Sequence, residues 1–183
     1  MIQTAGGSPV REFGTRYTAA LAIHPDNRTL ASGHWDNVTL WNMLSGERIA
    51  LLAGFGRCIS GIAFSRGGRW LAAGTDDGNL QIWDVAARRR THALRVGWAF
   101  VSTPAFSPDG KLVAVGTYAD GTVTLVDVAS GAILSQIQVS MFGCVSVAFS
   151  PDGRYLVTPS NSGILQSGRF EKGGSIRVFE VTR

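Results

Sequence analysis

The most constraining feature of the sequence is a segment that recurs four times at nearly constant spacing. It runs from a short apolar stretch through a turn into a second apolar stretch, as in AFSPDGKLVAVG. The four copies occupy residues 22–33, 63–74, 105–116 and 148–159. A second segment, such as LQIWDV, follows each copy, at residues 38–43, 80–85, 123–128 and 176–181. Two segments that recur together indicate one structural unit repeated along the chain.

Each unit predicts four short antiparallel strands. The turn after the first strand is strongest at 107–110 and 150–153, where SPDG combines a proline that presets φ with an Asp-Gly pair that tolerates left-handed angles. The second and third strands are apolar almost throughout, and the fourth is looser, at 47–53, 90–96 and 132–139. No segment shows helical periodicity with caps, so we predict an all-β chain.

A single unit of this kind cannot cover both of its apolar faces. Copies that stack around an axis cover one another, which explains why the second and third strands do not alternate between apolar and polar residues. Alanines recur in the first strands, at positions 19, 20, 22, 63, 105 and 148. Small side chains are expected where strands crowd around a central axis.

The composition narrows the class of protein. Apolar residues make up 45% of the chain and charged residues 16%, which excludes a highly charged disordered chain. Cys58 and Cys144 form no CxxC pair, so neither a zinc ribbon nor a disulfide-rich scaffold is supported. No apolar run is long enough for a membrane span, and the first residues lack signal-peptide character. We therefore expect a cytoplasmic protein in a reducing compartment.

The period, the AFSPDG turn and the LQIWDV ending together resemble the WD-repeat (WD40) β-propeller family. The resemblance covers residues 9–183 and implies one propeller domain over 1–183, with four four-stranded blades. The expected units span about 15–53, 54–96, 97–139 and 140–183, with 9–14 as a closing strand. The resemblance is specific for the fold and says little about the ligand.

The family also implies a polar tetrad in each blade, of which this sequence keeps only parts. The tryptophan position holds Trp41, Trp83, Val126 and Phe179. The turn aspartate is present as Asp36, Asp77 and Asp120, and the serine or threonine position holds His34, Thr75, Thr117 and Ser160. The family's Gly-His pair is replaced by Gly14-Thr15, Gly54-Phe55 and Gly97-Trp98. No blade can form the full network, so packing must hold the blades together.

The two ends of the sequence suggest how a ring closes. Residues 9–14 look like a fourth strand without the preceding three, and the last unit stops after its third strand. In the family, the N-terminal strand completes the last blade. Three arrangements stay open: a homodimer that shares an eight-bladed ring, part of a longer protein with further blades, or a closed four-bladed monomer.

By the same resemblance, the turns between second and third strands share one face of the disc with the links between blades, and that face usually binds partners. Aromatic and arginine side chains dominate the energetics of protein interfaces. On this face we place Trp35, Tyr118, Trp98, Phe55, Arg57, Phe142 and Arg16. Phe55 and Trp98 occupy the place of the tetrad histidine, so the alternative for both is a plug between blades.

The last unit carries an insertion over residues 160–174, which we expect to be a loop. Its apolar residues among Gly and Ser suggest a flap that docks on a surface, and the alternative is a filler for the gap left by the missing turn.

These features predict a non-enzymatic scaffold that binds a protein or peptide, without cofactor or metal. The alternative is a propeller-based enzyme such as a metal-dependent hydrolase, but His24, His34 and His92 show no metal-ligand spacing. The run Arg88-Arg89-Arg90 is more typical of a solvated loop than of a phosphate site, so we expect no nucleic-acid partner. No membrane partner is expected either.

Overall fold

The computed structural model describes residues 12–15, 17–140, 146–166 and 169–182. For residues 161–173 it describes the backbone alone. All fifteen elements in this part of the chain are strands, which confirms the all-β prediction. The strands form four antiparallel sheets, and in each sheet the spatial order follows the order along the chain. Each unit of the sequence thus folds locally as a meander.

The four sheets take their strands from consecutive stretches of the sequence. The first sheet contains β1 (Ala20–Ile23), β2 (Thr29–Gly33), β3 (Asn37–Asn42) and β4 (Arg48–Ala53). The second contains β5 (Ile59–Phe64), β6 (Trp70–Thr75), β7 (Asn79–Asp84) and β8 (Arg89–Arg95). The third contains β9 (Ala105–Phe106), β10 (Leu112–Gly116), β11 (Thr122–Asp127) and β12 (Ile133–Gln138). The last contains β13 (Ala148–Phe149), β14 (Tyr155–Gln166) and β15 (Arg169–Glu180).

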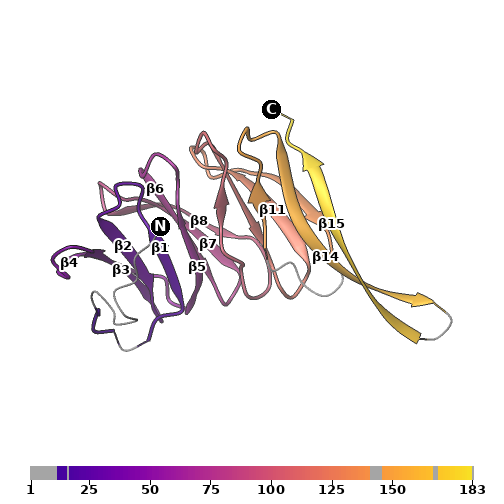
Figure 1. Cartoon of the computed structure of the whole chain (residues 1–183), viewed down its shortest axis with the longest axis horizontal. Coiled ribbons are helices and arrows are strands. Elements are labelled where there is room, and N and C mark those ends of the chain that lie inside the picture. Colours follow the sequence, from indigo (N-terminus) through magenta and orange to yellow (C-terminus); the bar gives the residue numbers. More distant parts are fainter. Residues whose placement is uncertain (1–11, 16, 141–145, 167–168, 183) are drawn as a thin grey trace, which may run out of the picture.

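The sheets stack face to face in a row (Figure 1). Their first strands lie closest to one another, since β1 contacts β5, β5 contacts β9, and β9 contacts β13. The close approach of these first strands explains why they contain alanine and glycine. A Cβ atom added to Gly61 of β5, for example, would lie 2.6 Å from the Cα atom of Thr103.

Three apolar clusters fill the three spaces between consecutive sheets. Leu40 and Leu52 meet Ile62 and Leu71 in the first space. Leu80 and Ile82 meet Val113 and Val126 in the second, and Ala114 and Val123 meet Val147 and Leu156 in the third. The second sheet is therefore apolar on both faces because it has a neighbour on each side, and the burial of such areas is the main stabilising term.

In the first, third and last sheets, an aspartate side chain stabilises the turn between the first two strands by accepting hydrogen bonds. Asp109 accepts hydrogen bonds from the Ser107 hydroxyl (2.7 Å) and the Lys111 backbone N–H (3.1 Å). Gly110 follows at a φ of 70°. In the first sheet Asn27 takes the place of this glycine at a φ of 55°, an angle that asparagine tolerates better than most residues. The sequence HPDN thus forms the same turn as SPDG.

The expected closure of a ring is not confirmed. In Figure 1 the row is open, with the first sheet at one end and the last sheet at the other. The last sheet has three strands, and no described residue forms a fourth beside β15. Of the predicted closing strand 9–14, residues 12–14 are described and belong to no strand. Phe13 packs instead against Trp41 of the first sheet, with ring centroids 5.6 Å apart.

The prediction of a loop over 160–174 is wrong. β14 and β15 pair without interruption from Tyr155 opposite Glu180 to Gln166 opposite Arg169. The insertion therefore lengthens two strands of the last sheet into a hairpin that projects from the row (Figure 1). Antiparallel pairing satisfies the backbone groups of both arms, which a loop of this length would leave to water.

Gly78 offers a test of the close backbone approach where β7 begins beside the end of β8. Its φ is 91°, and a Cβ atom there would lie 2.2 Å from the carbonyl oxygen of Gly97. Its own carbonyl accepts hydrogen bonds from Val96 and Gly97. We expect Gly78→Ala to lower the free energy of unfolding by about 2 kcal/mol or more, and the melting temperature by roughly 4–8 °C. Gly67→Ala is the control, because no atom lies within 4 Å of a Cβ there. Equal melting temperatures for the two variants would contradict this account.

Candidate protein-binding face

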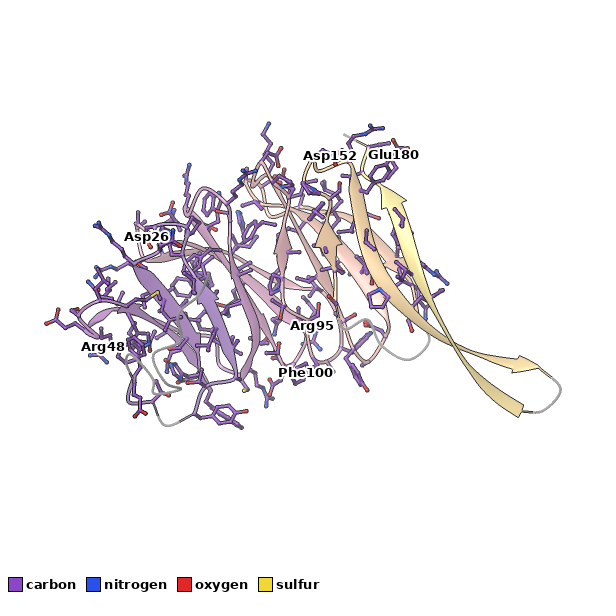
Figure 2. The ribbon with its side chains drawn as sticks, in the orientation of Figure 1. Asp26, Arg48, Arg95, Phe100, Asp152 and Glu180 are labelled. Carbon is purple, nitrogen blue, oxygen red and sulfur yellow. The ribbon has the colours of Figure 1, made fainter. Side chains whose placement is uncertain are left out.

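The links that join one sheet to the next lie at the same edge of the row as the turns between second and third strands. This follows from the meander, since antiparallel strands reverse direction at each turn. We call this edge the loop face, and it comprises residues 34–36, 54–58, 76–78, 96–104 and 117–121. Figure 2 shows Arg95 and Phe100 at this edge, and Asp26 and Asp152 at the opposite one.

Backbone hydrogen bonds join the loops of neighbouring sheets into one surface. Ile59 donates to the carbonyl of His34 (3.0 Å), and Phe100 donates to that of Asp76 (2.9 Å). Tyr118 in turn donates to the carbonyl of Phe100 (2.9 Å). These bonds connect first to second sheet, and second to third, so the loops are fixed relative to one another.

Exposed aromatic side chains are concentrated on and beside the loop face. Of the exposed aromatic residues in the described part of the chain, five lie there, namely Tyr17, Trp35, Trp98, Phe100 and Tyr118, and Tyr155 lies at the opposite edge, where β14 begins. Tyr17 precedes β1 and so lies at the same edge, with its ring centroid 6.4 Å from that of Trp35 in an edge-on arrangement. The Arg95 guanidinium lies 5.9 Å from the centre of the Trp98 ring. The sequence analysis missed Tyr17 and Phe100, although both flank first strands.

Trp98 and Phe55 hold the same place in their units but have opposite environments. Phe55 is 6% exposed and stacks on Trp83, with ring centroids 5.3 Å apart. Trp98 is 79% exposed. The third sheet carries Val126 where the second carries Trp83, so Trp98 has no ring of its own sheet to stack on. Phe55 thus plugs the gap between sheets, while Trp98 points to solvent.

Three further residues were predicted to lie on this face: Arg57, Phe142 and Arg16. Arg57 is exposed, and its Nε lies 3.9 Å from the Asp77 carboxylate, as in a weak surface ion pair. Phe142 and Arg16 lie outside the described residues.

The tetrad-like residues form separate pairs instead of one network. Thr75 donates a hydrogen bond to Asp77 (2.6 Å), and Thr117 donates one to Asp120. The Trp83 indole donates to Gln81 (3.2 Å) and not to Thr75.

The first sheet has a different series of side-chain hydrogen bonds. The Trp41 indole donates to Ser32 (2.7 Å), which is hydrogen-bonded to His34 (2.8 Å), and His34 reaches the Tyr17 carbonyl. Asp36 accepts from the Asn37 side chain instead (2.8 Å). Ser32 was not singled out in the sequence, because the repeat places alanine at the equivalent position 73.

The side chains of the other two histidines, His24 and His92, each reach a backbone carbonyl of a neighbouring sheet's turn. His24 Nε2 is 3.0 Å from the Gly68 carbonyl, and His92 Nε2 is 3.2 Å from that of Ala129. Across the described residues, no group of three or more histidine, cysteine or acidic side chains could hold a metal ion. In the arginine run, Arg90 donates to the Gly54 carbonyl (3.0 Å).

Cys58 belongs to the loop face, where its carbonyl accepts a hydrogen bond from the Asp76 backbone N–H (3.0 Å). Burial raises the pKa of the Cys58 thiol, and the negative charge of Asp76 raises it further. A thiol with a raised pKa stays protonated at neutral pH and is a poor nucleophile. This environment is typical of a structural cysteine.

The comparisons with known proteins agree with the repeat. The family model described as "WD domain, G-beta repeat" matches residues 7–42 and 46–84. The chain belongs to the WD-repeat family. A second family model, described as "Eukaryotic translation initiation factor eIF2A", matches residues 74–167. The two matches overlap at residues 74–84, in the second sheet.

Several curated WD-repeat proteins are similar to this chain over part of their length. An uncharacterized WD repeat-containing protein of Synechocystis is 32% identical over 140 residues, which is 76% of this chain and 40% of the relative. Small ribosomal subunit protein RACK1z of rice is 31% identical over 62% of this chain and 35% of its own length. WD repeat-containing protein VIP3 of Arabidopsis is 31% identical over 73% and 46%. The chain thus spans less than half the length of these relatives.

Within the described residues, no helix has the length and apolar character needed to cross a membrane.

The plug formed by Phe55 gives a stability prediction. Phe55→Ala removes a buried ring from the first apolar cluster, so we expect a loss of about 3 kcal/mol in the free energy of unfolding. Trp98→Ala removes an exposed ring at the equivalent position and should change stability by less than about 0.5 kcal/mol. Urea denaturation of the two variants measures both values. A Trp98 variant as unstable as the Phe55 variant would show that Trp98 packs.

The Thr75–Asp77 pair gives a pH prediction. Burial alone raises the pKa of Asp77, but hydrogen bonds from Thr75 and Asn79 outweigh it, and the pKa lies below its usual range. The pair therefore stabilises the fold above the ordinary aspartate pKa of about 3.9 and loses this effect as pH falls through the lower folded value.

We expect Thr75→Val to raise the pKa of Asp77 and to flatten this acid dependence. The carboxyl carbon shift of Asp77, followed by NMR against pH, measures the change. Thr117→Val in the third sheet is the control and should leave the Asp77 pKa unchanged. An unchanged pKa in the Thr75 variant would contradict the assignment.

Proposed function

We propose that this protein is a non-enzymatic WD-repeat scaffold whose loop face binds a protein or a peptide. The observation that carries the proposal is the gathering of Tyr17, Trp35, Trp98, Phe100 and Tyr118 at one edge, all exposed. Isolated exposed apolar residues are ordinary, but a group of aromatic rings at one edge is typical of an interaction site.

The rings suit protein recognition for two reasons. Aromatic side chains bury a large area and have few rotatable bonds, so they contribute much binding free energy at a small cost in entropy. The backbone bonds between His34 and Ile59, and between Asp76 and Phe100, already hold the loops in place before a partner arrives. Little further ordering is required on binding.

The arrangement favours a protein partner over a nucleic acid. Single-stranded nucleic acids require aromatic rings together with a continuous basic groove. Arg88 lies in the turn between β7 and β8, at the edge opposite the loop face, and Arg89 and Arg90 begin β8. Arg90 donates a hydrogen bond to the Gly54 carbonyl. Family membership supports the same reading. The proposal includes a cytoplasmic location and no cofactor.

Peptides selected from a random phage-displayed library on the immobilised protein provide the probe. We expect Trp98→Ala, and Trp35→Ala combined with Tyr118→Ala, to weaken the selected peptides at least about tenfold, or about 1.4 kcal/mol, because each removes exposed ring area. The melting temperature should stay nearly unchanged. Leu44→Ala is the matched control, since Leu44 is equally exposed but lies in the turn between β3 and β4 at the opposite edge.

Peptides that bind both aromatic variants as tightly as they bind the wild type would contradict the proposal. So would an equal loss of stability and binding, which would identify these rings as packing residues.

A further inference from the structure

The loop face is acidic although the chain as a whole is basic. The residues that define this face include one arginine, Arg57, and no lysine or glutamate. The aspartates on it are Asp36, Asp76, Asp77 and Asp120, whereas the whole chain has a net charge of +4. A partner with positive charge is therefore attracted to this edge of the row.

Two of these carboxylates, those of Asp36 and Asp120, are held by neutral hydrogen-bond donors. The Asn37 side-chain amide donates to Asp36 (2.8 Å), and the Thr117 hydroxyl donates to Asp120. Among the described residues, neither carboxylate forms an ion pair with an arginine, lysine or histidine. Amides and hydroxyls fix the position of a carboxylate without compensating its charge, so both stay available to a cation.

Asp76 has an uncompensated carboxylate of a second kind. Its backbone carbonyl accepts a hydrogen bond from the Phe100 N–H (2.9 Å), so this aspartate lies beside an exposed ring. Its Oδ1 atom is buried and accepts no hydrogen bond. A buried carboxylate oxygen without a donor costs free energy, and a cation that a partner brings near this carboxylate lowers the cost.

Exposed rings accompany the other two carboxylates. Trp35 immediately precedes Asp36 in the turn between β2 and β3, and Tyr118 lies two residues before Asp120 in the turn between β10 and β11. Asp120 also lines, together with Trp98, one cavity of about 310 Å³ between the second and third sheets. The loop face thus presents negative charge next to flat apolar surfaces.

The opposite edge of the same chain shows what such a combination binds. Two arginines there lie both over an aromatic ring and beside a carboxylate. They are Arg69, over Trp70 (4.5 Å) and beside Asp84 (3.3 Å), and Arg154, over Tyr155 (5.5 Å) and beside Glu180 (3.9 Å). A guanidinium is flat and carries several N–H donors, so it contacts a ring with its face and a carboxylate with its edge.

The loop face carries the rings and the carboxylates without a matching set of arginines. Arg95 borders this face and lies over Trp98 (5.9 Å), but it forms no ion pair with Asp120. Across the residues that the structure describes, no arginine or lysine lies over the ring of Trp35 or Tyr118. These rings are 67% and 58% exposed and are accessible to a partner.

We propose, in an extension that rests on the proposed function, that the loop face binds an arginine-bearing segment of its partner. Guanidinium groups of that segment stack on the rings of Trp35 and Tyr118 and pair with the carboxylates of Asp36 and Asp120. The other aspartates of the face add to the attraction. Arginine suits this site better than lysine, because an ammonium group offers no flat face to a ring.

The phage-displayed peptides selected on the immobilised wild type provide the probe. We expect arginine to be enriched among those peptides that require the rings of the loop face. Citrulline keeps the shape of arginine and lacks its charge, so the exchange of these arginines for citrulline should weaken binding at least about tenfold. This measurement uses the wild-type protein, so the stability of a variant does not affect it.

A matched pair of variants locates the effect on the protein. Asp36→Asn combined with Asp120→Asn removes two charges and keeps a side-chain oxygen at each position. We expect it to bind the arginine peptides at least about tenfold more weakly, with a nearly unchanged melting temperature. Glu47→Gln combined with Asp152→Asn is the control, because it changes the net charge equally at the opposite edge, where Figure 2 shows Asp152. The control should retain the wild-type affinity.

The outcomes separate this proposal from the proposed function. Selected peptides that depend on Trp35 and Tyr118 but contain no arginine would overturn the arginine-bearing partner and leave the binding face intact. So would arginine peptides that bind the Asp36 and Asp120 variant as tightly as the wild type. Equal weakening by the control variant would reduce the effect to overall charge and overturn the proposal as well. Peptides that ignore the aromatic variants would instead contradict the proposed function itself.

Discussion

The face-to-face burial of apolar sheets is the interaction on which the rest of this structure depends. Each meander is apolar on both faces of its second and third strands, so no single sheet is stable in water. Stacking removes these faces from solvent three times along the chain, in the clusters around Leu40, Ile82 and Val123. The outer faces of the first and last sheets carry exposed apolar side chains such as Leu21 and Val178, whereas their inner faces are buried.

Polar contacts add local order to this packing without forming one repeated network. The first sheet joins Trp41 to His34 through Ser32, whereas the second joins Thr75 to Asp77 and covers Trp83 with Phe55. In the second sheet the Trp83 indole donates to Gln81 and its ring stacks on Phe55, so the tryptophan has different partners from those of Trp41. Such substitutions are tolerated because the sheets are held by buried area, which depends on shape and apolar character more than on particular hydrogen-bonding groups.

The loop face derives its proposed function from the same scaffold. Backbone hydrogen bonds between loops of neighbouring sheets exist only because stacking brings the loops together, as for Phe100 and Asp76. The aromatic side chains on these loops are then free to contact a partner, since the core is already filled. The proposed function therefore assigns stability and recognition to different residues, with the buried Phe55 in the first role and the exposed Trp98 in the second.

The sequence by itself determined the repeat unit, the strands and their turns, because alternation of apolar stretches with Asp-Gly turns acts over a few neighbouring residues. The resemblance to the family grouped Thr75 and Thr117 with turn aspartates, and the sequence identified Trp35 and Tyr118 as turn aromatics. Only the tertiary structure decided that Phe55 is buried and Trp98 exposed, because that depends on whether the sheet provides Trp83 or Val126 as a neighbour. It likewise decided that residues 160–174 extend β14 and β15, and that Phe13 packs on the first sheet. These outcomes depend on pairing and packing between distant segments, which a local sequence pattern does not encode.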